Sequence, residues 1–269
     1  MDTTFIKLLI FGLLAALANI LGGLVLSPKA FHKRYNRWLK YLLALGAGFM
    51  LAVTFIEILP RSMEEWQRQA GSSSASLLGP MLLVLAGYLI TQFFEHTVAP
   101  HLHLGGEMHC DDHDHEMILP RTAYTAVAGL LIHTFFDGVS IAAASEIDMR
   151  TGTLVFIAVF LHKFPEGFTI GSMITAAGKG MREVLAATSL IGVVTLIGVI
   201  AFYLAGPAAG FSVAYALPFA GGIALYVSAS DLIPEVNHHG GKNPLVSLSV
   251  FAGVALFFMT HQLLHATME

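Results

Sequence analysis

Two stretches of the chain, HTFFDGVSIA from His133 to Ala142 and HKFPEGFTIG from His162 to Gly171, decide the fold. Each has a histidine, a carboxylate four residues later, and then a glycine, and each lies inside a long apolar segment. Residues four apart share one face of a helix, so each stretch presents an imidazole and a carboxylate on the same side. If these segments cross a membrane, each buried ionisable group costs roughly 2.5 to 3.5 kcal/mol, and the duplicated pattern then indicates a functional site.

The composition is that of an integral membrane protein. Hydrophobic residues make up 55% of the 269 residues, charged residues make up 12%, and the mean hydropathy is +0.71. Soluble domains carry about twice as many charged residues. A helix of about 20 apolar residues crosses a bilayer, and such runs occur near residues 4–26, 39–60, 77–99, 121–145, 152–177, 183–206, 213–235 and 245–266. We therefore predict an all-α protein, a single polytopic transmembrane domain over residues 1–269 with eight spans.

The distribution of lysine and arginine predicts the orientation. Alternate loops hold nine of these residues on one side of the membrane and four on the other, and Lys163 belongs to neither set. The positive-inside rule then places both termini outside the cytoplasm and the connection between the third and fourth spans inside it. We interpret the basic cluster Lys33, Arg34, Arg37 and Lys40 as a determinant of this topology and not as a nucleic-acid binding patch. The expected partner is the lipid bilayer of the cell membrane.

The predicted cytoplasmic connection over about residues 100–119 is rich in metal-ligating side chains. It carries three aspartates, the single cysteine of the chain, and five histidines: His101, His103, His109, His113 and His115. Such a polar tract cannot build a core. Imidazole and carboxylate groups at this density bind divalent transition metals weakly, so we interpret these histidines as loop metal contacts. A solvated polar loop without metal is the alternative.

The two opening stretches offer four ligands at the centre of the protein. We expect His133, Asp137, His162 and Glu166 to converge, with Ser140 and Thr169 on the same helix faces. Two imidazoles and two carboxylates suit tetrahedral Zn²⁺ and tolerate Fe²⁺, Mn²⁺, Co²⁺ or Cd²⁺. Pro165 lacks an N–H, which predicts a kink in the fifth span. The alternative is that these groups only hydrogen-bond between helices.

A second pair of segments suggests an inverted repeat. GAGFMLAVTFIEILP, ending at Pro60, resembles AGGIALYVSASDLIP, ending at Pro234, and the match aligns Glu57 with Asp231. Related segments of opposite orientation are typical of transporters with a site at the repeat interface. We expect a pathway with Glu57 near the outer mouth, and the following residues near the inner one: Asp231, Glu235, His238 and His239.

The motifs HTFFDG and HKFPEG, with DLIPE from Asp231 to Glu235, the histidine-rich connection and eight spans, resemble the zinc-iron permease (ZIP) family of divalent metal transporters, of the prokaryotic type. The resemblance covers essentially the whole chain. It implies a transporter and not an enzyme, with Zn²⁺ or another divalent ion as the substrate carried into the cytoplasm and no catalytic cofactor. It also implies a homodimer, and it assigns the transport site to the four ligands of the fourth and fifth spans.

The chain departs from the two-metal version of that family site. Some members have an amide or a carboxylate immediately after each motif's first residue, where this chain has Thr134 and Lys163. We therefore predict a single metal ion. Lys163 has two alternative roles: it pairs with Glu166 and assists metal release, or loss of solvation disfavours its ammonium and it accepts a proton during transport.

The alternative function, from another class of protein, is an intramembrane zinc-dependent lipid hydrolase. In it, Asp137 and Ser140 near His133 would support attack by a zinc-activated water. Catalytic zinc keeps three protein ligands and one open position, whereas this pattern offers four ligands beside a cation. A metal exporter fits the helix count and motif form less well. Release of fatty acid would indicate the hydrolase, and ion flux without chemistry would indicate a transporter.

Overall fold

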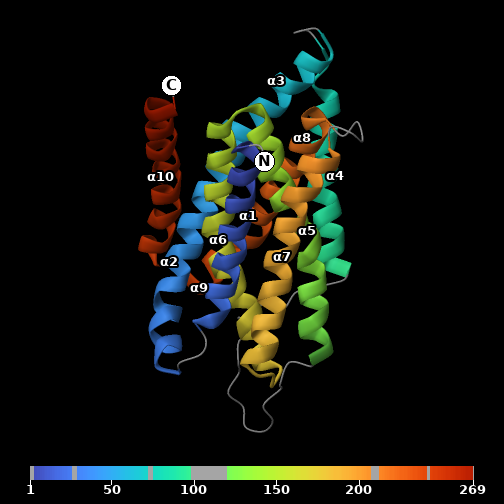
Figure 1. Ribbon diagram of the computed structural model, residues 1–269. Helices are drawn as coiled ribbons and strands as arrows, with labels where there is room; N and C mark the ends of the chain where they lie inside the picture. Colours follow the sequence, from blue (N-terminus) through green and yellow to red (C-terminus); the bar gives the residue numbers. More distant parts are fainter. Residues whose placement is uncertain are drawn as a thin grey trace.

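The computed structural model describes residues 3–25, 29–71, 75–97, 120–206, 212–240 and 243–268, with the side chains of 29–39, 120–123, 126, 176, 238–240 and 268 excepted. The regular elements of these residues are all helical (Figure 1). They are α1 (Thr3–Leu24), α2 (Lys29–Val53), η1 (Thr54–Ile58), α3 (Leu59–Gln69), α4 (Leu78–Thr97), α5 (Pro120–Ile147), α6 (Met149–Ala176), α7 (Met181–Ala205), α8 (Val213–Tyr226), η2 (Val227–Leu232), α9 (Ile233–Gly240) and α10 (Pro244–Met268).

The prediction of eight spans is confirmed. Among the described residues, eight continuous helical segments are long and apolar enough to cross a membrane. The second of these segments joins α2, η1 and α3 and ends at Gln69, nine residues beyond the expected end. The extension is amphipathic, with Trp66 and charged residues on different faces, so a purely apolar run does not include it. α6 is continuous through Pro165.

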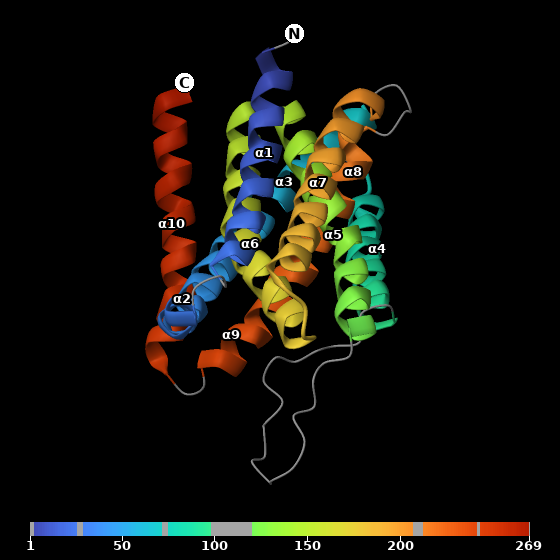
Figure 2. The same ribbon diagram turned by 60° about the horizontal axis from the view of Figure 1, so that its bottom comes forward.

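The helices form two groups. In the first, α1 packs along α6 and α7, and α5 packs along α6 and α7. In the second, α2 packs along α10, and α8 packs along α3 and α4. The groups meet where α5 contacts α8 and where α2 contacts α6. Figure 2 shows α9 at the end opposite both chain termini; we call these the α9 end and the termini end.

Glycines allow the closest helix pairs to approach backbone to backbone. In the α5–α7 pair, a Cβ on Gly138 would meet the Thr195 carbonyl, and a Cβ on Gly198 would meet the Phe135 carbonyl. The pairs α1–α6, α2–α10 and α4–α8 repeat this reciprocal arrangement, with the glycines Gly22 and Gly167, Gly48 and Gly253, and Gly87 and Gly222. In lipid the hydrophobic effect does not drive helices together, and association depends on close van der Waals packing. Small residues at the contact permit that packing.

Gly138→Ala is therefore expected to destabilise the protein by about 1–3 kcal/mol, the usual cost of overpacking. Gly46→Ala is the matched control, because its Cβ would lie 3.5 Å from the nearest atom, the Leu161 carbonyl oxygen, which is ordinary contact. Both changes gain the same helix propensity. Thermal unfolding in detergent measures the difference, and equal stability of the two variants would contradict this account of the α5–α7 contact.

The two segments of the suggested inverted repeat share a local conformation. η1 and η2 are π-helical turns, and each ends two residues before a proline, Pro60 or Pro234. In each, an N–H bonds to the carbonyl five residues earlier, from Leu59 to Thr54 and from Ile233 to Ser228. The Thr54 and Ser228 hydroxyls both donate to the carbonyl four residues earlier, at 2.8 Å. A π-helical turn is wider than an α-helical one, and it accommodates a following proline, which has no backbone N–H to donate.

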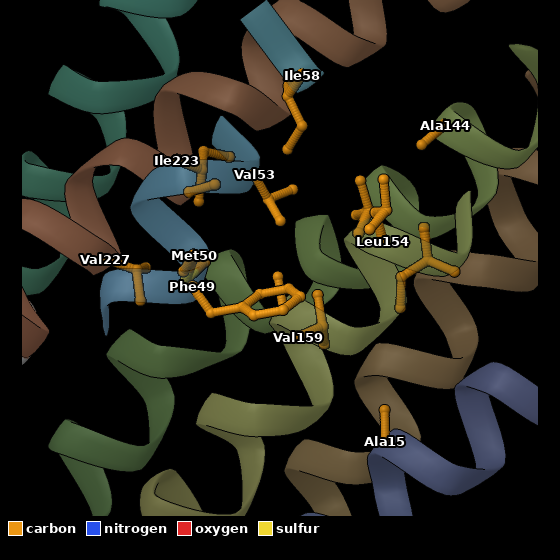
Figure 3. Packing of buried hydrophobic residues seen from close by; sticks show 14 of the residues in the cluster. Ala15, Phe49, Met50, Val53, Ile58, Ala144, Leu154, Val159, Ile223 and Val227 are labelled. Carbon is orange, nitrogen blue, oxygen red and sulfur yellow. The ribbon is translucent and has the colours of Figure 1, made fainter. Parts of the chain in front are cut away.

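One layer of the main apolar core lies on the termini side of the helix centres. Figure 3 shows Phe49, Met50 and Val53 of α2 packed toward Leu154 and Val159 of α6. All five side chains are buried. α5 ends and α6 begins at the termini end, on either side of Asp148, so this layer stands between that end and residues 133–137 and 162–166. We call it the apolar plug.

Candidate metal centre

The antiparallel packing of α5 and α6 brings the four predicted ligands together. His133, Asp137 and Glu166 each offer one ligand atom, and these atoms lie within 4.8 Å of one another. His162 Nε2 lies 3.3 Å from Asp137 Oδ2 and 4.0 Å from Glu166 Oε2, and His133 Nε2 lies 3.7 Å from Glu166 Oε1. Tetrahedral Zn²⁺ with bonds of about 2.0–2.1 Å holds its ligand atoms about 3.3 Å apart. His133, Asp137 and Glu166 are thus close to the spacing that one ion requires, and His162 lies beside Asp137 and Glu166 at the edge of this group.

Hydrogen bonds orient both imidazoles. His162 Nδ1 donates to the Ala158 carbonyl at 3.0 Å, because a carbonyl oxygen can only accept. His133 Nδ1 lies 3.0 Å from Glu95 Oε1 and donates to that carboxylate. In both rings Nε2 therefore faces the ligand cluster. Such bonds fix the ring orientation and make the imidazole a better ligand, as carboxylate–histidine–metal arrangements do.

Glu95 of α4 is not among the ligands predicted from the sequence, yet it contacts one of them. Its carboxylate is buried and supports His133 from the other helix group. The available signal was an acidic residue inside an apolar span, followed directly by His96. That signal draws attention to Glu95 but does not identify its partner, which lies 38 positions away in the chain.

Lys163 lies inside the cluster and is fully buried. Its Nζ is 2.6 Å from Glu166 Oε2, 2.9 Å from Asp137 Oδ2 and 3.0 Å from Thr134 Oγ1. The Thr134 hydroxyl donates in turn to Glu166 Oε1 at 3.2 Å. The ammonium is therefore placed between the two carboxylates, and it neutralises part of their charge.

The other residues predicted near the site take different positions. Thr169 lines the cavity beside Glu166. The Ser140 hydroxyl donates to the Asp137 backbone carbonyl at 2.7 Å, so it supports the helix and not the carboxylate. Pro165 leaves the Leu161 carbonyl without its usual helical donor, and this oxygen lies near Gly46 of α2.

A cavity of about 120 Å³ leads from the cluster toward the α9 end. His133, His162 and Glu166 line it at the cluster, and Asp231 and Glu235 line it farther along. This volume holds several water molecules. The role of Asp231 and Glu235 on a pathway stays a prediction. On the termini side, the apolar plug covers the cluster.

Glu57 lies at the termini end, as expected, but it is buried and paired. Its side chain is 5% exposed, and Thr151 Oγ1 donates to its Oε1 at 2.7 Å. The sequence predicts a position near the outer mouth, but it does not identify a distant partner such as Thr151. The side chains of His238 and His239 in α9 lie outside the described part of the structure, as do His101, His103, His109, His113 and His115.

Comparison with known proteins gives consistent results. The family described as "ZIP Zinc transporter" matches residues 3–118 and 100–261. The chain is 28% identical to the zinc transporter ZupT of Chlorobium luteolum, over 97% of this chain and 99% of that protein. The corresponding ZupT of Nitratidesulfovibrio vulgaris is 27% identical, over 94% and 96%. The human zinc transporter ZIP10 is 27% identical over 51% of this chain, and the match spans only 17% of the human protein.

Proposed function

Because the chain belongs to the ZIP zinc transporter family, we propose that it carries a divalent metal ion across the membrane, with Zn²⁺ as the principal substrate. His133, Asp137, His162 and Glu166 hold the ion during transport. The observation that carries this proposal is the convergence of these four groups between α5 and α6, at ligand-like spacing, where a cavity reaches them from one end.

The orientation follows from charge. In the sequence, the connections predicted on the side that α9 occupies, together with the adjoining helix ends, hold nine lysines and arginines, whereas those on the side of the termini hold four, so we place the α9 end in the cytoplasm. The described conformation is then open toward the cytoplasm and closed by the apolar plug toward the outside. Zn²⁺ leaves His133 and Glu166 past Asp231 and Glu235, where carboxylates replace part of its hydration shell. This direction corresponds to uptake.

We infer that the site holds one ion at a time. Lys163 places a positive charge between Asp137 and Glu166, where a second divalent ion would need to share the same carboxylates. Like charges at this separation repel strongly in a buried site. Of the two roles weighed for Lys163, its 2.6 Å contact with Glu166 supports the first: the ammonium compensates the carboxylates when the metal leaves.

The relatives named above are zinc transporters, and they give no support to the lipid hydrolase. Four protein ligands with an adjacent ammonium also leave no evident open position for a catalytic water. Location in the cell membrane and assembly as a homodimer remain part of the proposal, because they come from the family resemblance. No step of the proposed cycle forms or breaks a covalent bond.

Zinc uptake into proteoliposomes tests the function. Vesicles that enclose a fluorescent zinc indicator should show saturable uptake, above that of protein-free vesicles. His113→Ala should leave the uptake largely intact, because this histidine belongs to the loop and not to the four-ligand site. Absence of flux for Zn²⁺, Fe²⁺, Mn²⁺, Co²⁺ and Cd²⁺, with protein verified as folded, would overturn the transport proposal and leave the hydrolase to be assayed.

A further inference from the structure

A group of charged and polar side chains lies at the termini end, apart from the metal centre. Arg61 of α3 contacts Glu57 Oε1 through Nε at 3.5 Å and Asp148 Oδ2 through Nη2 at 3.4 Å. Thr151 donates to Glu57 at 2.7 Å, and His261 Nε2 lies 3.5 Å from Glu57 Oε2. These five residues, Glu57, Arg61, Asp148, Thr151 and His261, form what we call the outer network.

The outer network connects the two helix groups. Glu57 and Arg61 belong to the second span and His261 to α10, which pack together in one group. Asp148 and Thr151 stand at the start of α6, in the other group. Two contacts therefore cross between the groups: Arg61 with Asp148, and Glu57 with Thr151.

Each charged member keeps a partner within its own group when the crossing contacts break. Arg61 retains Glu57 and also Glu64, at 3.3 Å. Asp148 retains the Thr151 N–H, which donates to its Oδ1 at 2.7 Å and caps α6. The Arg61 and Asp148 side chains are 27% and 36% exposed, so water can solvate both. Separation of the groups here therefore leaves no isolated buried charge, which would be strongly unfavourable.

We propose that the outer network is a latch, which holds the two helix groups together at the termini end and thereby keeps that end closed. The inference rests on the proposed function, because a transporter that releases metal at the α9 end must open at the termini end to load it. The apolar plug seals the pathway, and the latch sets how often the plug opens. The latch is reversible because only its two crossing contacts are lost on opening.

Asp148→Asn tests the latch with little risk to folding, because asparagine caps a helix as well as aspartate does while the charge that faces Arg61 is removed. Cys110→Ser is introduced first, and one reporter cysteine is added per protein. Ala144 of α5 is a buried residue of the same apolar cluster as the plug, so Ala144→Cys reports opening there. Leu130→Cys reports access through the cavity on the α9 side. A hydrophilic thiol reagent is applied in detergent, where both ends are accessible.

With Asp148→Asn, labelling at position 144 should accelerate by about two- to fivefold, the effect of a partly exposed ion pair, and labelling at position 130 should slow. Arg68→Gln is the matched control: it removes the Arg68–Glu65 pair, which lies within α3, and should change neither rate. Unchanged rates at 144, or faster labelling at both positions, would overturn the latch. These readouts need no zinc flux, so the latch and the transport function fail independently.

Discussion

Replacing His162 by alanine should abolish zinc uptake into proteoliposomes. His162 Nε2 faces Asp137 and Glu166. Because Nδ1 carries the proton that it donates to the Ala158 carbonyl, the lone pair of Nε2 is directed at the ion position. Removal of a group that only supports a ligand typically costs 10- to 100-fold in metal affinity. Loss of a ligand itself should therefore reduce zinc affinity and uptake by more than about a hundredfold. Uptake and equilibrium zinc binding are both measured.

Two matched variants make this result specific. His265→Ala, near the end of α10, removes an imidazole remote from the site and should retain uptake. Glu95→Gln removes the charge that supports His133, and should give an intermediate loss of about 10- to 100-fold in zinc affinity. Normal uptake by a folded His162→Ala protein would show that metal crosses elsewhere, and would overturn the assignment of the site.

Replacing Lys163 by methionine should raise the affinity for zinc while it slows transport. The change keeps the length of the side chain and removes the ammonium that contacts both Asp137 and Glu166. A unit charge about 4 Å away interacts by several kcal/mol at an effective dielectric constant of about 20. After allowance for rearrangement, we expect Kd to fall by about tenfold or more. Release toward Asp231 then becomes slower, and turnover falls.

Titration of the purified protein with zinc measures the affinity, and the same preparations are reconstituted for uptake. Lys163→Arg keeps the charge and should bind zinc much more like the unchanged protein, although its planar head group changes the contact geometry. The double change Thr134→Asn and Lys163→Asp introduces an amide and a carboxylate beside the site, and this protein should bind two ions in place of one. Weaker zinc binding by Lys163→Met would contradict the proposed role of the ammonium.

The choice of site residues shows how far pattern alone reaches. The pairs His133 with Asp137, and His162 with Glu166, lie on common helix faces because helical spacing is local, and the structure brings them together as expected. Ser140 fits the same spacing, yet its hydroxyl bonds to the backbone. Spacing predicts which side of a helix a residue occupies, but it does not predict which acceptor its hydroxyl selects.

The sequence by itself determined the eight spans and the helix faces that bear the predicted ligands, because apolar length and helical periodicity are properties of neighbouring residues. Only the tertiary structure decided that Glu95 supports His133, that the cavity reaches the site from the α9 end, and that Glu57 is buried against Thr151. Those contacts join residues 38 and 94 positions apart. They depend on how the two helix groups pack, and packing between groups leaves no periodic signal in the chain.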